Sequence, residues 1–484
     1  MKLKEAKAKQ VWNLFEALSL IPRPSKQEEK VCDWLEGLAS QYQREIMRDE
    51  VGNIVITIPA TSGYENAPGV VIQAHTDMVC EKMPDKEHDF TKDPIRLKEK
   101  EGWVWADGTT LGADNGIGLC MGLSLLEEKD LPHAQIELLC TVDEETGLTG
   151  ANSLQPGFVT GSRLINLDTE EEGVFTVGCA GGEQTDIMLP LAWQAPPPGF
   201  VFYQLKVAGL TGGHSGVNIH LQRANAICLT GACLNRMAVG SEVHLADLTG
   251  GNAHNAIARD ARATVCLSPA TAETLKKRVQ SFENEIRTVF GQSDPDLAVH
   301  FEPVEIESQI IRADMVYRIY RLLHGLPHGV DRISTEYDGI VETSCNLAEV
   351  KINCDENFLH IVTSHRSFNP ASQDLLTGRI CALAEMAGAR VTNSNSYPAW
   401  QPRVESELQK ICGNLYQSLR GKPPVIEVIH AGLECGIIGD KHPGMDMISF
   451  GATIEDLHSP TERVNIESVD KVWAFLLKLL PELK

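Results

Sequence analysis

Short motifs that combine histidine and acidic residues recur along the chain, and these are the residue types that bind divalent metal ions. In His75-Thr-Asp77, imidazole is a common metal ligand, and a nearby carboxylate can orient the ring by accepting its second N–H. Further candidates lie in four later segments: Asp114 in 112–118, Glu144 and Glu145 in 142–147, Asp168 in 167–172, and His458 in 457–460. Two histidines with several carboxylates form a ligand set that suits Zn²⁺, Co²⁺ or Mn²⁺.

Each motif also has a plain structural explanation when it is taken alone. His75 could be a surface or satisfied core histidine, and Asp114 could cap the helix that begins at residue 115. The acid runs 143–145 and 168–172 are typical of solvated surfaces, and His458 could be an ordinary surface histidine. The combined pattern favours metal binding, because five or more carboxylates gathered at one place repel one another unless cations neutralise them.

The elements that would position these residues are strands alternating with helices. Apolar, β-branched runs predict strands over 53–58, 70–74, 136–142 and 164–167, and a helical pattern follows the glycine-rich segment 112–118. This alternation predicts an α/β domain with a mixed, largely parallel sheet flanked by helices. Ligands of such sheets bind beyond the carboxyl ends of the strands, which is where the motifs lie.

Two metal ions that share one carboxylate would form a co-catalytic site that activates a water molecule. A carboxylate that does not ligate could serve as the general base for that water.

Two proline-containing segments, which interrupt the predicted helices and strands, divide the chain into three parts. The segment 191–199 (LAWQAPPPG) cannot continue a helix or a central strand, and 393–402 (NSNSYPAWQP) marks a second break. We therefore predict a first part of one domain over 1–183, an inserted α+β domain over 184–397, and the second part of the first domain over 398–484. Similar stretches at 255–265 and 346–363 suggest that the inserted domain is doubled, although the match alone does not establish a repeat.

The composition predicts a soluble cytoplasmic protein. The net charge of -23 argues against nucleic acid or an anionic membrane as a partner. The 13 cysteines include no CxxC pair, which is typical of reduced thiols. Apolar residues from Val11 to Leu18 follow helical spacing, so the amino-terminal stretch predicts an amphipathic helix and not a signal peptide. No apolar run approaches the roughly 20 residues that a membrane span requires.

The five motifs, in this order and spacing, resemble those of the co-catalytic dizinc exopeptidase family, which includes carnosinases, aminoacylase and succinyl-diaminopimelate desuccinylase. Within the family, the chain resembles bacterial dipeptidases that cleave Xaa-His peptides, and this resemblance extends over essentially the whole chain. It is carried by the stretches DFTKDPI, TTLGADNGIG, EEEG, GCAGG, GGHSG, VETS, HAGLECG and MDM.

The resemblance implies a role for each motif residue. One metal ion would be held by His75, Asp114 and Asp168, and the other by Asp114, Glu145 and His458, with Asp114 bridging. The two ions would be zinc, with cobalt or manganese as alternatives. Asp77 would support His75 without touching metal, and Glu144 would be the general base that later protonates the leaving amine. The family also implies a cis peptide bond between Asp114 and Asn115.

The inserted domain resembles the lid of this family. In Gly212-Gly-His214-Ser-Gly216 the histidine would contact the developing oxyanion, and the pattern does not form the G-x-S-x-G elbow of serine hydrolases. Asn255 and Arg366 match substrate-binding positions, with Arg366 suited to a free carboxylate, and the loop 431–434 with Gly432 matches one that lines the carboxylate pocket. Because this lid is about twice the family's shorter length, we expect His214 and Arg366 to serve their own chain. A homodimer through another surface is left open.

The resemblance thus implies a metallopeptidase that hydrolyses dipeptides, preferentially Xaa-His dipeptides such as carnosine, by attack of a metal-bridged water. Two alternatives remain. The first is another amide hydrolase of the family, either an N-acyl amino acid deacylase or a broader di- or tripeptidase. The second is a non-catalytic peptide-binding relative.

Overall fold

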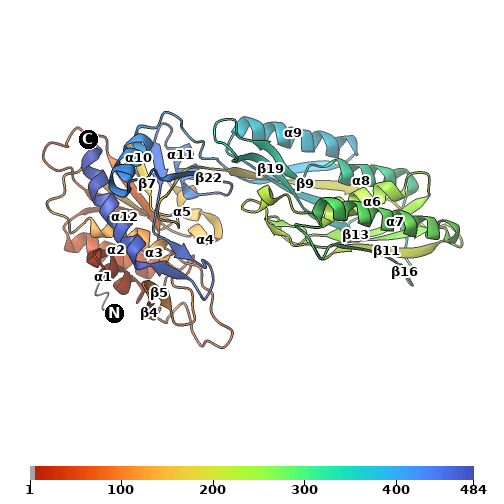
Figure 1. Cartoon of the computed structure of the whole chain (residues 1–484), viewed down its shortest axis with the longest axis horizontal. Helices are drawn as coiled ribbons and strands as arrows, with labels where there is room; N and C mark the ends of the chain where they lie inside the picture. The colour runs from red at the N-terminus through yellow and green to blue at the C-terminus, as the bar shows by residue number, and fades with distance from the viewer. Residues whose placement is uncertain (1–5) are drawn as a thin grey trace. The chain divides into compact units, whose positions relative to one another are not determined.

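The computed structural model describes residues 6–484, so the first five residues of the predicted amino-terminal part lie outside it. Within that range the chain forms two compact units (Figure 1). The first unit comprises the chain up to Cys179, Trp400–Val428 and Leu433–Lys484. The second comprises Ala180–Ala399 and Ile429–Gly432. The predicted lid domain, 184–397, falls within the second unit, and its role as a lid stays a prediction.

The first unit is built on a mixed eight-stranded sheet in the order β1-β2-β6-β3-β7-β23-β8-β22. Its centre is parallel, because β3 pairs in parallel with β6 and β7, and β7 pairs in parallel with β23. The antiparallel strands β2 and β8 flank this centre. The strands are β1 (Glu45–Arg48), β2 (Ile54–Ile58), β3 (Val70–His75), β6 (Ile136–Thr141), β7 (Arg163–Asn166), β8 (Val174–Cys179), β22 (Val425–Ile429) and β23 (Asp446–Ser449).

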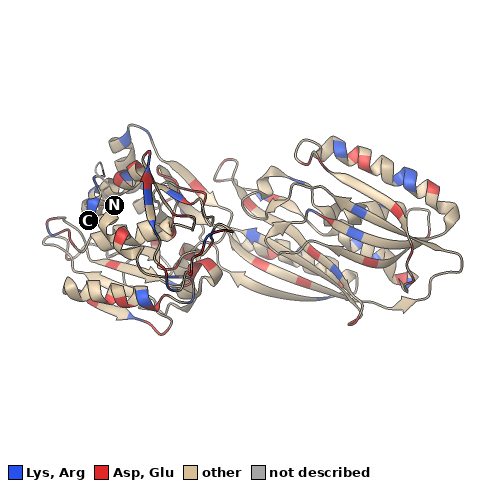
Figure 2. Ribbon diagram, turned by 90° about the horizontal axis from the view of Figure 1, so that it is seen from below, with Lys and Arg blue, Asp and Glu red and all other residues tan. Residues whose placement is uncertain are grey.

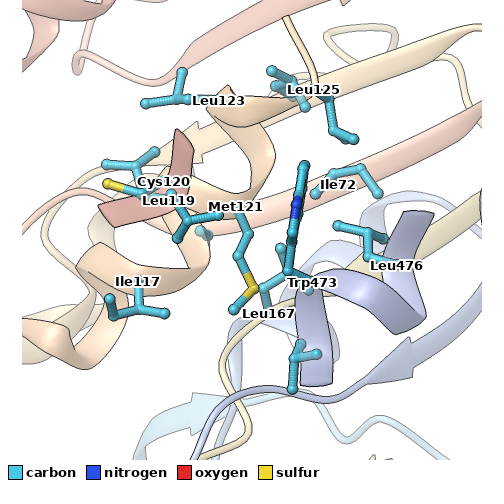
Figure 3. Close-up of a cluster of buried hydrophobic side chains, with 14 of the residues drawn as sticks. Ile72, Ile117, Leu119, Cys120, Met121, Leu123, Leu125, Leu167, Trp473 and Leu476 are labelled. Atoms are coloured by element: carbon cyan, nitrogen blue, oxygen red, sulfur yellow. The ribbon is translucent and has the colours of Figure 1, made fainter. Parts of the chain in front are cut away.

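Helices cover both faces of this sheet, which explains why every residue of its central strands β3, β6 and β7 is buried. Ile72 of β3 packs in the larger core, whereas its neighbour Val71 packs in a second core on the opposite face. Trp473 of α12 lies beside Met121 of α3 in the larger core (Figure 3). The helices on that side are α1 (Lys9–Leu18), α2 (Glu29–Gln41), α3 (Ala113–Ser124), α10 (Glu407–Arg420) and α12 (Ile466–Leu479); α5 (Thr149–Ser153) and α11 (Glu434–Lys441) lie on the other. The predicted fold class is confirmed.

A small antiparallel sheet in the first unit carries the segment that contains His458. Its strand order is β24-β25-β5-β4, and His458 lies in the turn between β24 and β25. The strands are β4 (Leu97–Lys100), β5 (Trp103–Ala106), β24 (Ile454–Glu455) and β25 (Arg463–Asn465).

The second unit contains a nine-stranded sheet in which two four-stranded halves meet edge to edge at β13 and β19. The halves run β16-β11-β15-β13 and β21-β9-β20-β19, so each has the same order of strands and helices along its chain, and β18 pairs with β19. The first half contains β11 (Val201–Ala208), α6 (Ala226–Met237), β13 (Val243–Gly250), β15 (Ala261–Leu267), α7 (Pro269–Phe290) and β16 (Ala298–Val304). The second contains β9 (Gly181–Pro190), α8 (Ala313–Gly325), β18 (Gly329–Ile333), β19 (Val341–Asn353), β20 (Phe358–Ser367), α9 (Pro370–Met386) and β21 (Arg390–Tyr397).

All four of these helices contribute to one core, so they cover one face of the nine-stranded sheet. The unit is therefore a doubled βαββαβ fold. Short pairs of strands complete the unit: β10 (Trp193–Gln194) with β17 (Ile310–Ile311), and β12 (Gly213–His214) with β14 (Ala256–Ile257).

Acidic and basic residues are interspersed along the elements of both units (Figure 2). The cysteines are all free thiols, and most of them are buried. Within residues 6–484, no helix combines the length and the apolar character needed to cross a membrane.

Candidate active site

His75 ends β3 and is almost fully buried, with 1% of its side chain exposed. Its Nδ1 lies 3.2 Å from Asp77 Oδ1, which leaves Nε2 facing the other candidate residues. The Asp77 carboxylate also accepts hydrogen bonds from Ser25 Oγ (2.7 Å) and from the backbone N–H groups of Glu144 (3.1 Å) and Glu145 (3.2 Å). Burial alone would raise the pKa of Asp77, but its interaction with His75 outweighs burial and lowers the pKa to about 2.

Asp114 lies between the two candidate histidines. Its Oδ1 is 3.1 Å from His75 Nε2, and its Oδ2 is 3.2 Å from His458 Nε2. The backbone of Asp114 (φ -80°, ψ 112°) is not helical, and the peptide bond to Asn115 is cis, as the resemblance implied. Because its two carboxylate oxygens face the two histidines, the position of Asp114 disfavours a plain helix cap.

Asp168 follows β7 and faces the same centre, with Oδ1 3.6 Å from His75 Nε2. The Asn115 side-chain amide donates a hydrogen bond to this oxygen. A Cβ atom at Gly118 would overlap Asn115 Oδ1 and would lie 2.5 Å from the Leu167 carbonyl oxygen. Glycine at 118 is therefore required for α3 to approach β7 this closely.

Glu144 and Glu145 begin the short helix α4 (Glu144–Gly147) directly after β6. The chain turns at Asp143, whose φ is +50° and whose carboxylate accepts hydrogen bonds from two threonine hydroxyls. Glu145 Oε2 lies 3.2 Å from His458 Nε2, and its Oε1 is buried without a hydrogen-bond partner. No residue within 6–484 forms a hydrogen bond or ion pair with the Glu144 carboxyl group, and burial raises its pKa well above the ordinary value.

The two histidines differ in exposure but both favour the protonated form in this cluster of acids. His458 has a left-handed backbone (φ +56°), and 53% of its side chain is exposed. Hydrogen bonds to Asp114 and Glu145 raise the pKa of His458 to about 11. At His75 burial lowers the pKa, but the charge of Asp168 and the hydrogen bond to Asp114 outweigh burial and raise the pKa well above its ordinary value.

The cluster fits a divalent metal ion because its carboxyl groups outnumber its two histidines. Burial raises the pKa of Asp168 well above its ordinary value and that of Glu170, in the same loop, to about 7. One ligand atom each of His75, Asp114 and Glu145 lies within 4.8 Å of the others. A divalent ion would neutralise the carboxylates and take the lone pairs of neutral imidazole nitrogens. It would also satisfy the buried Glu145 oxygen that has no partner.

In the second unit, His214 lies on β12 in a conformation that fixes its tautomer. Its Nδ1 accepts hydrogen bonds from the backbone N–H groups of Gly216 and Val217, both at 3.1 Å. The proton of the neutral ring is therefore on Nε2. Burial, followed by the charge of Arg366, lowers the pKa of His214 and favours this neutral form. Asn255 is exposed.

Arg366 lies on β20 of the second unit with 9% of its surface exposed. Its Nη1 donates a hydrogen bond to the Tyr397 hydroxyl (2.5 Å), and its Nε is buried without a partner. The Tyr397 ring lies between two glycines, because a Cβ at Gly432 would be 2.9 Å from Tyr397 Cε2 and one at Gly182 would overlap the hydroxyl end. Gly432 thus provides space for the tyrosine that holds Arg366.

The predicted residues fall into two groups. The first unit brings together seven of them around His75 and Asp114: His75, Asp77, Asp114, Glu144, Glu145, Asp168 and His458. The second unit contains the other four: His214, Asn255, Arg366 and Gly432.

Several buried polar residues near these groups were not singled out from the sequence. Glu434, 1% exposed, accepts hydrogen bonds from Gln73 Nε2 (2.6 Å) and Thr141 Oγ1 (2.8 Å), and burial raises its pKa to about 7. The predicted carboxylate-pocket loop 431–434 is therefore divided, since Ile429–Gly432 belongs to the second unit and Glu434 to the first. In the second unit, Ser344 Oγ lies 2.7 Å from His430 Nε2. The motifs VETS and HAGLECG contain Ser344, His430 and Glu434 and were the available signal.

Comparison with known proteins identifies the family. The model of peptidase family M20/M25/M40 matches residues 71–482. The chain is 39% identical to the cytosol non-specific dipeptidase of Escherichia coli (strain K12) over 473 residues, which are 98% of this chain and 97% of that protein. The chain belongs to peptidase family M20/M25/M40. The family resemblance and the predicted metallopeptidase class are confirmed.

Solved structures agree with this assignment. The crystal structure of aminoacylhistidine dipeptidase from Vibrio alginolyticus superimposes with a TM-score of 0.94 and 38% identity, covering 100% of this chain and 98% of that one. Aminopeptidase PepT from Bacillus cereus matches with a TM-score of 0.58 and 16% identity over 99% of both chains, which indicates a shared fold. This member of the M20 family carries candidate metal-ligand groups at the carboxyl ends of its central strands.

Proposed function

We propose that this M20 peptidase hydrolyses dipeptides with the help of two divalent metal ions and prefers Xaa-His dipeptides such as carnosine. The observation that carries the proposal is the position of Asp114, which directs one carboxylate oxygen toward each histidine. Asp168 beside His75 and Glu145 beside His458 complete two ligand groups around it. The full-length similarity to two dipeptidases supports the substrate class.

His75, Asp114 and Asp168 would hold one ion, and Asp114, Glu145 and His458 would hold the other. Zinc suits this mixture of imidazole and carboxylate ligands best, with cobalt and manganese as alternatives. When bound, the ions would lower the pKa of a water molecule and polarise the peptide carbonyl group. Asp77 would keep the His75 ring in orientation through Nδ1.

Glu144 is the general base in this proposal. Its carboxyl group has no partner within residues 6–484, and burial raises its pKa, which suits a group that accepts a proton and later returns it. It would accept the proton of the attacking water and then deliver it to the amine that leaves. The backbone N–H of Glu144 donates a hydrogen bond to Asp77, which ties the start of α4 to the residue that supports His75.

The second unit would recognise the substrate as a lid. His214, with its proton on Nε2, would donate a hydrogen bond to the oxyanion. Arg366 would bind the free carboxylate of the dipeptide, with Tyr397 and Gly432 holding it in place, and Asn255 would add a further contact. We propose that these residues serve the active site of their own chain, because the doubled unit supplies a second half that would replace a partner's lid. A homodimer through another surface remains compatible with this arrangement.

The finer specificity is open to direct test. The Escherichia coli relative is called non-specific, which favours a broader dipeptidase as the second candidate. The name of that relative also supports a cytosolic location, which we propose for this chain.

A substrate panel with the zinc-loaded protein separates the candidates. We expect the highest kcat/KM for Xaa-His dipeptides, lower values for matched dipeptides without histidine, and no hydrolysis of N-acetyl amino acids. A tripeptide should be a poor substrate because its second residue offers Arg366 an amide instead of a carboxylate. Equal values for all dipeptides would replace the Xaa-His preference by broad specificity. Preferential hydrolysis of N-acetyl amino acids would indicate a deacylase, and peptide binding without hydrolysis would indicate a non-catalytic relative.

A further inference from the structure

Glu462 lies four residues beyond His458 and is 2% exposed. Its carboxylate accepts hydrogen bonds from four consecutive backbone N–H groups, those of 111–114, at 2.7, 3.0, 2.8 and 3.3 Å in chain order. These N–H groups lie at the start of α3 or just before it and lack partners within the helix, so they favour the carboxylate form of Glu462 against burial, which raises its pKa. Glu462 thereby connects the turn that carries His458 to the segment that carries Asp114.

Arg23 holds the same segment from its carbonyl side. The buried guanidinium donates from Nη2 to the Gly112 carbonyl oxygen (2.5 Å). From Nη1 it donates to the carbonyl oxygens of Thr76 (2.8 Å) and Asp77 (2.7 Å). Gly112 has φ +69°, and a Cβ there would lie 2.5 Å from Arg23 Nη2, so this approach requires glycine. Arg23 thereby connects the residues that follow His75 to the segment of Asp114.

The geometry points to Glu462 and Arg23 as positioning residues for the metal ligands. We propose that they hold the backbone of 111–114 so that the two oxygens of Asp114 face His75 and His458 at the separations required to bind metal ions. Neither side chain belongs to the ligand set itself. This inference rests on the proposed function, because it concerns the affinity of the proposed metal site.

A simpler role, general stabilisation of α3, predicts a different outcome. Glu137 provides the matched control within the first unit. It is 4% exposed, and its Oε2 accepts hydrogen bonds from the backbone N–H groups of Thr160 (2.8 Å) and Gly161 (3.0 Å). Glu137 is the second residue of β6, so it lies at the start of this strand, whereas Glu144 follows the end of the strand. Glu137 and Glu462 are thus both buried carboxylates that accept hydrogen bonds from the backbone of a loop, but only Glu462 binds the loop that contains Asp114.

The test compares Glu462→Gln with Glu137→Gln. Glutamine keeps the size of the side chain but turns an NH₂ group toward some of the N–H donors. We expect the zinc affinity of Glu462→Gln, measured by competition with a chromogenic chelator, to fall about 10- to 100-fold. Glu137→Gln should retain the wild-type affinity, while the melting temperatures of both metal-free variants fall. Excess zinc should restore most of the kcat of Glu462→Gln. Wild-type zinc affinity in Glu462→Gln, or an equal loss in both variants, would overturn the proposal.

Two further variants cover a failure of Glu462→Gln to fold. Glu462→Asp keeps the charge but is one methylene shorter, and Arg23→Lys cannot donate to three carbonyl oxygens in the same fork geometry. Both should also weaken zinc binding, and wild-type affinity in both would overturn the proposal. If the wild-type protein bound no divalent metal, the proposed function itself would fail. If the wild-type protein bound zinc and cleaved dipeptides while all these variants bound zinc normally, only the positioning role would fail.

Discussion

Asp77 and Glu144 are neighbouring carboxyl groups whose environments separate their pKa values. The interaction with His75 lowers the pKa of Asp77 to about 2 against the effect of burial, and Ser25 and two backbone N–H groups support the anion. Burial without a partner raises the pKa of Glu144. Such a separation assigns a permanent anion to one position and an exchangeable proton to the other. Asp77 therefore suits ligand support, and Glu144 suits acid–base chemistry.

Replacing Glu144 tests its role as the base. Glu144→Gln should lower kcat by about 10²- to 10⁴-fold, because glutamine cannot accept the proton of water. Zinc content, measured by elemental analysis, should stay at the wild-type level because Glu144 is not a ligand. Glu171→Gln, an exposed acid in the loop after β7, is the control and should keep full activity. Full activity of Glu144→Gln, or loss of zinc together with activity, would contradict the assignment.

At the scale of elements, β21 and β9 meet the loop Ile429–Gly432 around the ring of Tyr397. The ring lies against both Gly432 and Gly182, at distances that leave no space for a Cβ atom at either position. Any added methyl group at either glycine therefore displaces the ring and the guanidinium bound to its hydroxyl.

Gly432→Ala should raise KM for a dipeptide about tenfold or more, since a misplaced Arg366 loses a charge-assisted hydrogen bond to the substrate carboxylate. The effect on kcat should be smaller, and Tyr397→Phe should shift KM in the same direction. Gly378→Ala in α9 is the matched control. It has no atom within 4 Å of the added Cβ, and alanine favours the helix, so KM should not change. An unchanged KM in Gly432→Ala would exclude this contact from substrate binding.

The sequence predicted the strands that lead into the candidate metal-ligand motifs better than it predicted the residues that support those motifs. The strand before His75 is an apolar run that ends in a polar motif, so its type and the location of the site could both be read locally. Glu462 and Arg23 were missed because their contacts with the backbone of 111–114 leave no local pattern. Glu462 is 348 to 351 residues away from these partners, and Arg23 is 89 residues away from the Gly112 carbonyl group. The support from Tyr397 was missed for the same reason.

At the scale of the whole molecule, the doubling of the second unit explains why its repeat was weak in the sequence. The second half takes its first strand, β9, from before the first half, so the two halves do not follow each other as a tandem repeat. The return of Ile429–Gly432 to the second unit had no sequence signal either. These features depend on pairing across long sequence distances.

Three histidines with lowered pKa values should make the second unit sensitive to acid. Burial lowers the pKa of His328 and His365 to about 4 and that of His430 to about 3. Because an unfolded histidine has a pKa of about 6.5, the unfolded chain binds more protons as the pH falls below that value. These histidines therefore leave the free energy of unfolding at its full value above about pH 6.5. As the pH falls toward about 4, each histidine lowers this free energy by on the order of 3 kcal/mol.

Thermal unfolding of the metal-free protein between about pH 7.5 and 4.5 measures this effect. The melting temperature should fall with pH, and His365→Gln should reduce the slope. His365 is fully buried, and its ring nitrogens face Thr185, Thr377 and Glu183. The exposed His300 is the control, so His300→Gln should keep the wild-type slope. Equal slopes for wild type and His365→Gln would show that this histidine does not carry the acid sensitivity.

The central claim is that two ions around Asp114 make this chain a dipeptidase, and a zinc titration tests it most directly. Protein stripped with a chelator is titrated with Zn²⁺ while hydrolysis of an Xaa-His dipeptide is followed. We expect no hydrolysis in the stripped protein and a recovery that saturates at two zinc equivalents. Hydrolysis that persists without metal, or activity that is complete at one equivalent, would contradict the account.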